Sequence, residues 1–334
     1  MTKTCFSFFL VFLFLSESVS FTQEKENLYP SGHGMAKVYT NFHKEFTYHD
    51  YESGFEVTRA YLGYEFFMDE HFSAEVKLDI GSPEDESPYS KLKRYAFFKN
   101  AALEYRNDKL SWNFGIISLK QFKIQEKYWN HRYIYKSFQD EYKFGASADI
   151  GTSIEYRFTP WLTADATLMN GEGYYQLQID NTFKSGFGAS FYPSDFLIAR
   201  IYYDIMVNEA VQQSIASFIG IKKNDLTIGL EYNYKTNISF IQDHHIWGYS
   251  VYGLYNISDK WEIFGRFDRL SSKKYEYEEF GWNFDKDGSA LITGVQYQPI
   301  RYVKFSLNYH DWYPFPQNIE NHSLIYLNLE FILE

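Results

Sequence analysis

The feature that most restricts the fold of this chain is an alternation of apolar and polar residues that recurs along almost its whole length. In residues 72–80, FSAEVKLDI, each even-numbered side chain is apolar, whereas Glu75, Lys77 and Asp79 are charged. Successive side chains of a strand point to opposite faces, so this segment has one apolar and one charged face. Two folds accommodate such strands: a soluble sandwich of two sheets, and a membrane barrel whose charged face lines the lumen.

The alternation predicts about sixteen strands, most of them near the roughly 9 to 11 residues that a tilted strand needs to cross a bilayer. The expected strands are residues 36–44, 55–67, 72–81, 94–106, 110–118, 146–158, 161–170, 183–192, 195–206, 213–223, 225–235, 246–257, 260–270, 288–298, 302–311 and 322–333. No shift in composition separates them, so we expect one domain that covers residues 21–334.

The connections between these segments alternate in length. Short turns rich in Asp, Asn, Pro and Ser occur at MDEH, RNDK, FTPW, YPSD, KKND, ISDK and QPIR. Longer polar loops lie between them, for example 82–93, 119–145, 171–182, 236–245 and 271–287. This layout is typical of outer-membrane barrels, whose short turns face the periplasm. We therefore predict an all-β fold: a transmembrane antiparallel β-barrel of about sixteen strands, with long extracellular loops.

Aromatic content and charge favour the barrel over the sandwich. Tyr, Phe and Trp make up 21% of the chain, and membrane barrels place aromatic girdles at both interfaces. A charge on the lipid face near the midplane would cost roughly 2 to 4 kcal/mol, so we expect the charged face to be the inner one. Lys99 breaks the pattern because it is in phase with Phe97 and Leu103; either a bulge shifts the phase there, or that strand is covered. The net charge of −11 argues against nucleic acid as a partner.

Residues 1–20 have the features of a secretory signal peptide. A positive charge in MTKT precedes the apolar run CFSFFLVFLFL, and the small residues Ser18 and Ser20 follow it. A transmembrane anchor is the alternative, but the run is shorter than the roughly 20 apolar residues that a spanning helix needs. We therefore expect export with cleavage after Ser20. The only cysteine, Cys5, lies in this segment, so the mature chain has no thiol for a disulfide or a metal site.

Residues 119–145 form the longest connection and are the first candidate for a functional site, because long connections in compact folds are usually functional. Six basic and three acidic residues give this loop a net charge of +3 in a chain of net −11. Folded into the lumen, the loop would bring positive charge to the narrowest point and favour anions. A solvated surface loop is the alternative. The basic residues expected at the constriction are Lys120, Lys123, Lys127, Arg132 and Lys136.

The expected inner wall carries charges of both signs. Opposed charges across a lumen create a transverse field that orients polar solutes, but they do not by themselves make a pore strongly anion-selective. The residues expected to line the pore include Arg59, Lys77, Asp79, Asp149, Arg157, Arg200, Arg266 and Lys304.

Residues 114–158 resemble part of a known family. They contain the strand end FGIISLKQF, the elements WNHRYI and KSFQD, and the Asp149-Ile150-Gly151 start of the next strand. On these elements the segment resembles the third-loop region of porins from Bacteroidetes-type outer membranes, which belong with the phosphate-selective porin O and P family. The resemblance implies a sixteen-stranded porin, forming a homotrimer, whose third loop folds into the lumen and narrows it.

Three hypotheses for the function follow. The first, which we favour, is an outer-membrane porin surrounded by lipid, through which small hydrophilic solutes or inorganic anions diffuse passively without a cofactor or catalysis. The second is a barrel hydrolase, because Asp243, His244 and His245 in QDHHIW, or His310 and Asp311 in NYHDWY, could activate water near the outer rim. The third is a structural or adhesive barrel with a plugged lumen. Side chains do not fill a sixteen-stranded interior, which favours an aqueous channel.

Overall fold

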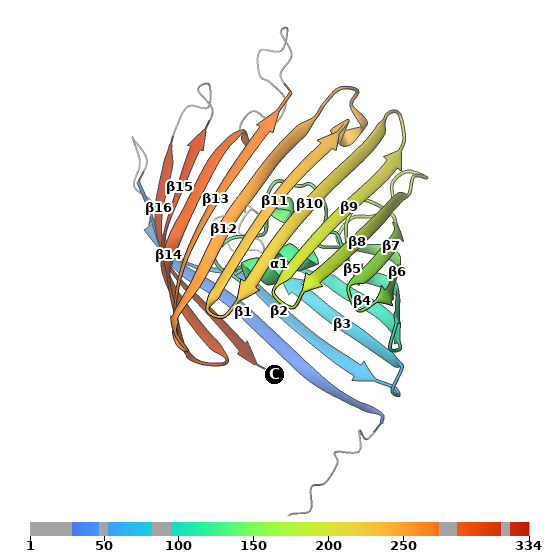
Figure 1. The fold of residues 1–334 in the computed structure, drawn as a ribbon, viewed down its shortest axis with the longest axis horizontal. Coiled ribbons are helices and arrows are strands. Elements are labelled where there is room, and N and C mark those ends of the chain that lie inside the picture. The colour runs from blue at the N-terminus through green and yellow to red at the C-terminus, as the bar shows by residue number, and fades with distance from the viewer. Residues whose placement is uncertain (1–28, 47–52, 82–94, 274–285, 315–320, 334) are drawn as a thin grey trace, which may run out of the picture.

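The computed structural model describes residues 29–46, 53–81, 95–273, 286–314 and 321–333, which form a closed antiparallel barrel (Figure 1). The elements are β1 (Ser31–Phe46), β2 (Ser53–Phe67), β3 (Phe72–Ile80), β4 (Ala96–Arg106), β5 (Leu110–Ser118), α1 (Lys123–Trp129), α2 (Phe138–Glu141), β6 (Ala148–Thr159), β7 (Leu162–Met169), β8 (Lys184–Ser194), β9 (Leu197–Val207), β10 (Val211–Lys223), β11 (Leu226–Thr236), η1 (Ile238–Phe240), β12 (Ile246–Ser258), β13 (Trp261–Ser272), β14 (Gly288–Ile300), β15 (Val303–Pro314) and β16 (His322–Leu333). The prediction of a sixteen-stranded antiparallel barrel is confirmed. No helix in the described part of the chain is long and apolar enough to cross a membrane. The predicted signal peptide lies outside the described residues.

Each strand pairs with its neighbours in sequence, and β1 closes the ring by pairing with β16. Most strand ends lie within two or three residues of the expected ones. The largest difference is at β1, which begins at Ser31 rather than at residue 36. Residues 31–35, SGHGM, do not alternate, but they pair with residues 63–67 of β2, so tertiary pairing extends the strand beyond the sequence pattern.

The two rims of the barrel differ, as the turn lengths predict. Each connection from an even-numbered strand to the next spans two to four residues, and β1 begins and β16 ends at the same rim. We call this the short-turn rim. The opposite, long-loop rim carries longer connections, including 119–147 and 170–183. One exception at that rim is the connection between β9 and β10, which consists of residues 208–210 only.

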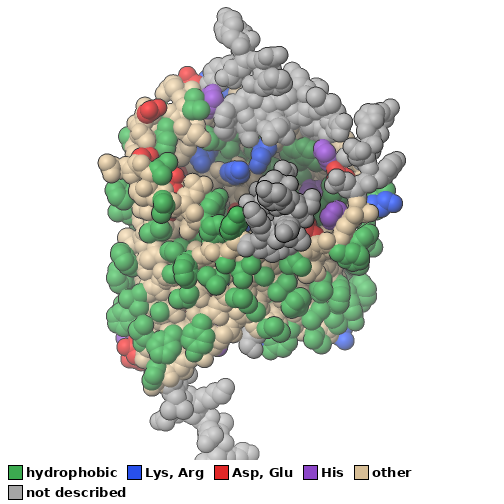
Figure 2. All heavy atoms as spheres, turned by 180° about the vertical axis from the view of Figure 1, so that it is seen from behind, with side chains coloured by type: hydrophobic (Ala, Val, Ile, Leu, Met, Phe, Trp, Pro, Cys, Tyr) green, Lys and Arg blue, Asp and Glu red, His purple; other side chains and the backbone are tan. Residues whose placement is uncertain are grey.

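The outer wall is apolar and the inner wall is polar. Large side chains at alternate positions are exposed on the outside, among them Phe114, Ile201 and Leu307. Figure 2 shows hydrophobic side chains spread over this wall, with most charged side chains at the rims or in the opening. The inward positions carry buried polar residues such as Asn233 and Ser250. A wall of this kind suits a lipid environment outside and water inside.

A β-bulge explains the irregularity at Lys99. The pairing of β3 with β4 shifts between Lys77, opposite Asn100, and Leu78, opposite Phe98. Lys99 is the additional residue of the bulge, and its ammonium contacts the Ser147 hydroxyl inside the barrel. Of the two explanations that the sequence leaves open, the bulge is therefore the correct one, because it turns the lysine inward.

Candidate functional site

The connection between β5 and β6, residues 119–147, lies inside the barrel, and Figure 1 shows α1 within the ring of strands. α1 lies against the inner faces of β10 and β11. At its end Trp129, which is 1% exposed, packs edge-on against Tyr252 and Phe264, with ring centroids 5.4 and 6.1 Å away. The Tyr252 hydroxyl also donates to the Gln125 carbonyl at 3.1 Å. We call residues 119–147 the inner loop, and these contacts fix its first half to the wall.

α2 fixes the second half of the inner loop through a second apolar cluster. Phe138 and Phe144 pack with Ile246 of β12 and Leu270 of β13, and all four side chains are buried. Gly248 makes room for this packing, because a Cβ there would lie 2.6 Å from the Phe138 ring. A glycine at an inward strand position is thus a sequence signal for the close approach of another segment.

Arg266 holds the centre of the inner loop. Its guanidinium donates to the Lys136 carbonyl at 2.7 Å and forms two hydrogen bonds, of 2.8 and 2.7 Å, with the Asp268 carboxylate. It also lies over the rings of Trp129 and Tyr135, at 4.9 and 5.2 Å. Arg266 is 2% exposed, so the structure places this residue beneath the loop and not on an open surface. It acts as a positioning residue.

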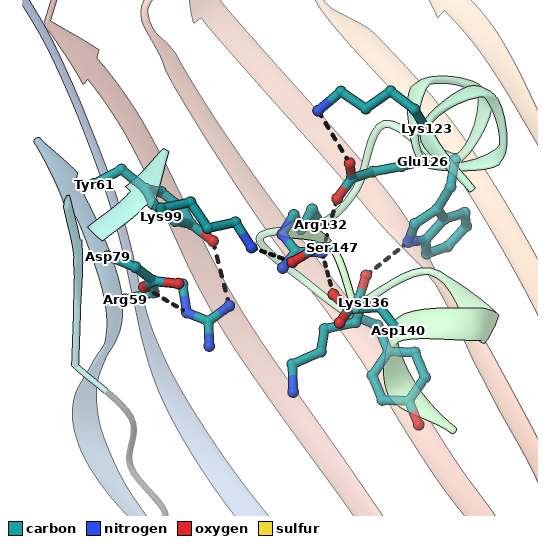
Figure 3. A network of polar contacts seen from close by, with 12 residues as sticks. Arg59, Tyr61, Asp79, Lys99, Lys123, Glu126, Arg132, Lys136, Asp140 and Ser147 are labelled. Carbon is teal, nitrogen blue, oxygen red and sulfur yellow. Dashed lines mark hydrogen bonds and ion pairs between the residues drawn. The ribbon is translucent and has the colours of Figure 1, made fainter. Parts of the chain in front are cut away.

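Charged side chains of the inner loop face charged side chains of β2 to β4 (Figure 3). On the loop, Arg132 donates to Glu126 at 2.7 Å and also to Asp140. On the wall, Arg59 lies 3.3 Å from the Asp79 carboxylate. Its guanidinium also donates to the Tyr61 hydroxyl at 3.3 Å. The structure therefore brings together Arg59, Asp79 and Arg132 of the sequence-predicted residues, with Lys136 beside them.

Burial and ion pairing shift the pKa values of the loop groups in different directions. At Arg132 burial opposes the charged form, but Tyr61, Asp140 and Glu126 outweigh it and raise the pKa well above its ordinary value. At Asp140 burial raises the pKa, and the charge and hydrogen bond of Arg132 more than offset this, so that the pKa is lowered. At Glu141 burial dominates and raises the pKa. Arg132 and Asp140 therefore stay charged as a pair.

The remaining predicted basic residues of the loop make longer ion-pair contacts or are exposed. Lys120 lies 3.4 Å from Glu155 of β6, and Lys123 lies 3.5 Å from Glu126 one turn along α1. Lys127 is exposed. The structure does not gather all five predicted lysines and arginines at one point, because α1 directs Lys123 and Lys127 away from the wall that it packs against.

The predicted wall residues divide into accessible and covered ones. Lys77 contacts Glu75 on its own strand, Lys304 lies 3.2 Å from Glu330, and Arg157 is exposed near the short-turn rim. Arg200 and Asp149, like Asp79 and Arg266, are almost fully buried. Arg200 is paired with Asp165 at 2.7 Å, and Asp149 accepts backbone N–H groups of Ile150 and Gly171 at 2.7 and 2.9 Å.

Sequence reasoning did not single out Tyr174, which reaches the same region from the connection 170–183. Its hydroxyl donates to Asp79 at 2.7 Å, and the Lys99 ammonium lies 4.1 Å from its ring centroid. The available signal is the segment NGEGYY, in which Gly171 and Gly173 both have positive φ and allow sharp turns.

The residues considered for catalysis lie in two separate settings. Asp243 lies 3.8 Å from His245 and 3.5 Å from Lys273 at the long-loop rim. His310 instead packs edge-on against Tyr135 of the inner loop, at 4.7 Å between ring centroids. Asp311 accepts a hydrogen bond from the Tyr309 hydroxyl at 2.6 Å. In the described part of the chain, no three His, Cys, Asp or Glu side chains are grouped closely enough to hold a metal ion.

Comparisons with known proteins give fold neighbours only. No family model and no curated protein matches the sequence. OmpF of Salmonella typhi, in a complex with daunomycin, has a TM-score of 0.66 and 10% identity over 90% of this chain and 98% of that one. An anion-selective porin from Comamonas acidovorans has a TM-score of 0.64 and 10% identity over 91% and 99%. OmpT of Vibrio cholerae, in a trimer form, has a TM-score of 0.58 and 11% identity over 91% and 100%. At such identities the likeness shows the fold alone.

Proposed function

We propose that this chain is an outer-membrane porin that lets small hydrophilic solutes or ions diffuse passively down their gradients. The observation that carries this proposal is an inner loop held inside a closed sixteen-stranded barrel with an apolar outer wall. Side chains of the wall do not fill a barrel of this size, so the inner loop determines the width that remains. The fold likeness to OmpF and to the Comamonas porin supports the proposal.

The passage, in this proposal, runs along the charged side of the inner loop next to strands β2 to β4, beside the points where the loop touches this wall at Lys99 and Tyr61. Basic side chains in Figure 3, namely Arg59, Lys99, Lys123, Arg132 and Lys136, stand beside Asp79, Glu126 and Asp140. Residues 119–145 carry a net charge of +3, which favours small anions weakly. Arg132 is the only arginine of residues 119–145 and is paired with two carboxylates, which supports a general anion preference better than a phosphate-specific site.

The proposal includes export by the signal peptide and assembly as a homotrimer in the outer membrane. A neighbour of the same fold, OmpT, is described in a trimer form, which supports the homotrimer. The exposed aromatic and aliphatic side chains of the outer wall provide surface for lipid or for neighbouring subunits.

The test is planar-bilayer conductance of the purified mature protein in a salt gradient. Wild type is compared with the triple variant Lys123→Gln, Lys127→Gln, Lys136→Gln and with a control, Lys222→Gln, Lys223→Gln, Lys260→Gln, whose exposed lysines lie at the short-turn rim. We expect stepwise currents, an anion-favouring reversal potential in wild type, and a shift toward cations in the loop variant that exceeds the shift in the control.

Two results would contradict the proposal in different ways. A folded barrel that never conducts would refute the porin and favour the plugged structural or adhesive barrel. Equal shifts in the loop variant and the control would leave the channel in place but refute a passage along the inner loop.

A further inference from the structure

A second connection at the long-loop rim, residues 170–183, also turns toward the interior. Gly171 has a φ of +102°, and its N–H donates to the Asp149 carboxylate at 2.9 Å. Gly173 has a φ of +89° and lies beside Ala146 of the inner loop, since a Cβ on this glycine would be 3.6 Å from that of Ala146. These turns direct the next residue, Tyr174, across β4 to β6 to reach β3.

The far end of this connection is fixed as well. The Asp180 carboxylate accepts the Thr182 N–H at 2.9 Å and the Asn208 side-chain amide, which belongs to the neighbouring connection, at 2.9 Å. Carboxylates therefore hold the connection at both ends, Asp149 at its start and Asp180 near its finish. Because both ends of the connection are fixed, the backbone between them determines where Tyr174 lies.

Tyr174 lies between a wall anion and a wall cation. Its hydroxyl donates to one Asp79 oxygen at 2.7 Å, while the other oxygen of that carboxylate lies 3.3 Å from Arg59. Its ring covers the Lys99 ammonium at 4.1 Å, a favourable cation–π distance. Lys99 is 8% exposed. Within the described residues its ammonium contacts Ser147 and this ring, and no carboxylate lies within ion-pair distance of it.

We infer that Tyr174 is a specificity-determining residue of the passage, because its ring shields the positive charge of Lys99 from passing solutes and restrains the preference for anions. This inference rests on the proposed function. The shielding differs from that of an ion pair, since the ring excludes solute from the ammonium but does not neutralise its charge. Removal of the ring widens the passage and presents Lys99 to small inorganic anions.

The test uses chloride and potassium as probes in bilayers that contain the full mature chain. Tyr174→Ala is expected to raise the single-channel conductance. It should also raise the chloride-to-potassium permeability ratio about tenfold, because one unit charge at roughly 6 Å in water would favour chloride and disfavour potassium by about threefold each. The double variant Tyr174→Ala, Lys99→Gln should keep the higher conductance but lose the gain in selectivity. Tyr174→Phe, which keeps the ring, should retain the selectivity of wild type.

Tyr175→Ala is the matched control, because this neighbouring tyrosine is 56% exposed and packs on Phe97 with 5.8 Å between ring centroids. It should behave as wild type. A conducting wild type that does not differ from Tyr174→Ala overturns the inference and leaves the porin proposal standing. The inference is also overturned if the double variant Tyr174→Ala, Lys99→Gln gains as much chloride selectivity as Tyr174→Ala alone. If neither wild type nor any variant conducts, the proposed function is refuted, and the inference with it.

Discussion

The inner loop has two sides that are built differently. The side toward β10 to β13 is apolar and locked, with Trp129 and Phe138 buried against the wall. The side toward β2 to β4 is mainly polar, with Arg132 paired to carboxylates and Lys123 exposed, and its apolar contact is Tyr133 against Tyr39 and Tyr61. Apolar burial stabilises a loop in any orientation that excludes water, whereas exposed charge pairs add little stability. The residues that hold the loop are therefore different from the residues that face the lumen. A passage of fixed width needs both.

The largest expected effect comes from breaking the locked side. Phe138→Ala removes a side chain with no exposed surface from the cluster that Gly248 accommodates, and a cavity of this kind costs about 3–5 kcal/mol. The inner loop should then detach while the strands stay paired. Amide hydrogen exchange should show lost protection at residues 123–142 and unchanged protection in β10 to β13.

Leu177→Ala is the control for this change, because Leu177 is 84% exposed on the other inward connection. It should leave exchange of the inner loop unchanged. Retained protection at residues 123–142 in Phe138→Ala would show that the polar side alone holds the loop, and would reverse the comparison between the two sides.

A smaller effect is expected at Arg266, where the locked side uses polar contacts. Arg266→Lys keeps the charge but loses the forked contact with Asp268 and the bond to the Lys136 carbonyl, which we expect to cost about 1–3 kcal/mol. Amide hydrogen exchange should show a partial loss of protection at residues 130–138. Arg157→Lys, at an exposed arginine near the short-turn rim, should have no effect. Equal exchange in both variants would show that Arg266 does not position the loop.

The strands could be predicted from the sequence because successive residues of each strand face two different environments, the apolar outside and the polar interior of the barrel. β5 and β16 begin and end at the predicted residues, since alternation there continues to the last paired residue. At β1 the non-alternating SGHGM is paired only because β2 is long enough to receive it. Period-two alternation cannot reveal such an extension, which depends on the partner strand.

The roles of the inward-facing residues could not be predicted from the sequence in the same way. Arg59 and Arg266 occupy inward strand positions of the same kind, and the sequence does not distinguish them. Whether a loop covers one and not the other depends on contacts between distant segments, such as that of Arg266 with Lys136. Tyr174 is one of 31 tyrosines, and only the turns at Gly171 and Gly173 direct it to Asp79.

The smallest expected effect compares two adjacent carboxyls of α2. The pKa of Glu141 is raised by burial, so the docked loop should gain stability as the pH falls through that raised value toward the ordinary one of about 4.3. The pKa of Asp140 is raised by burial but lowered further by Arg132. Its contribution is therefore complete above the ordinary value of about 3.9 and is lost only as the pH falls through the lowered one.

Exchange of the inner loop, corrected for intrinsic rates, should therefore slow slightly between neutral pH and about 4.5. Glu141→Gln should abolish this slowing, because the neutral amide has no proton to take up. Asp140→Asn should keep it, although it leaves Arg132 with Glu126 as its remaining carboxylate and so raises exchange throughout this pH range. If Glu141→Gln kept the slowing, another group would be its source. The two carboxyls of α2 would then not have pKa values shifted in opposite directions, by burial at Glu141 and by Arg132 at Asp140.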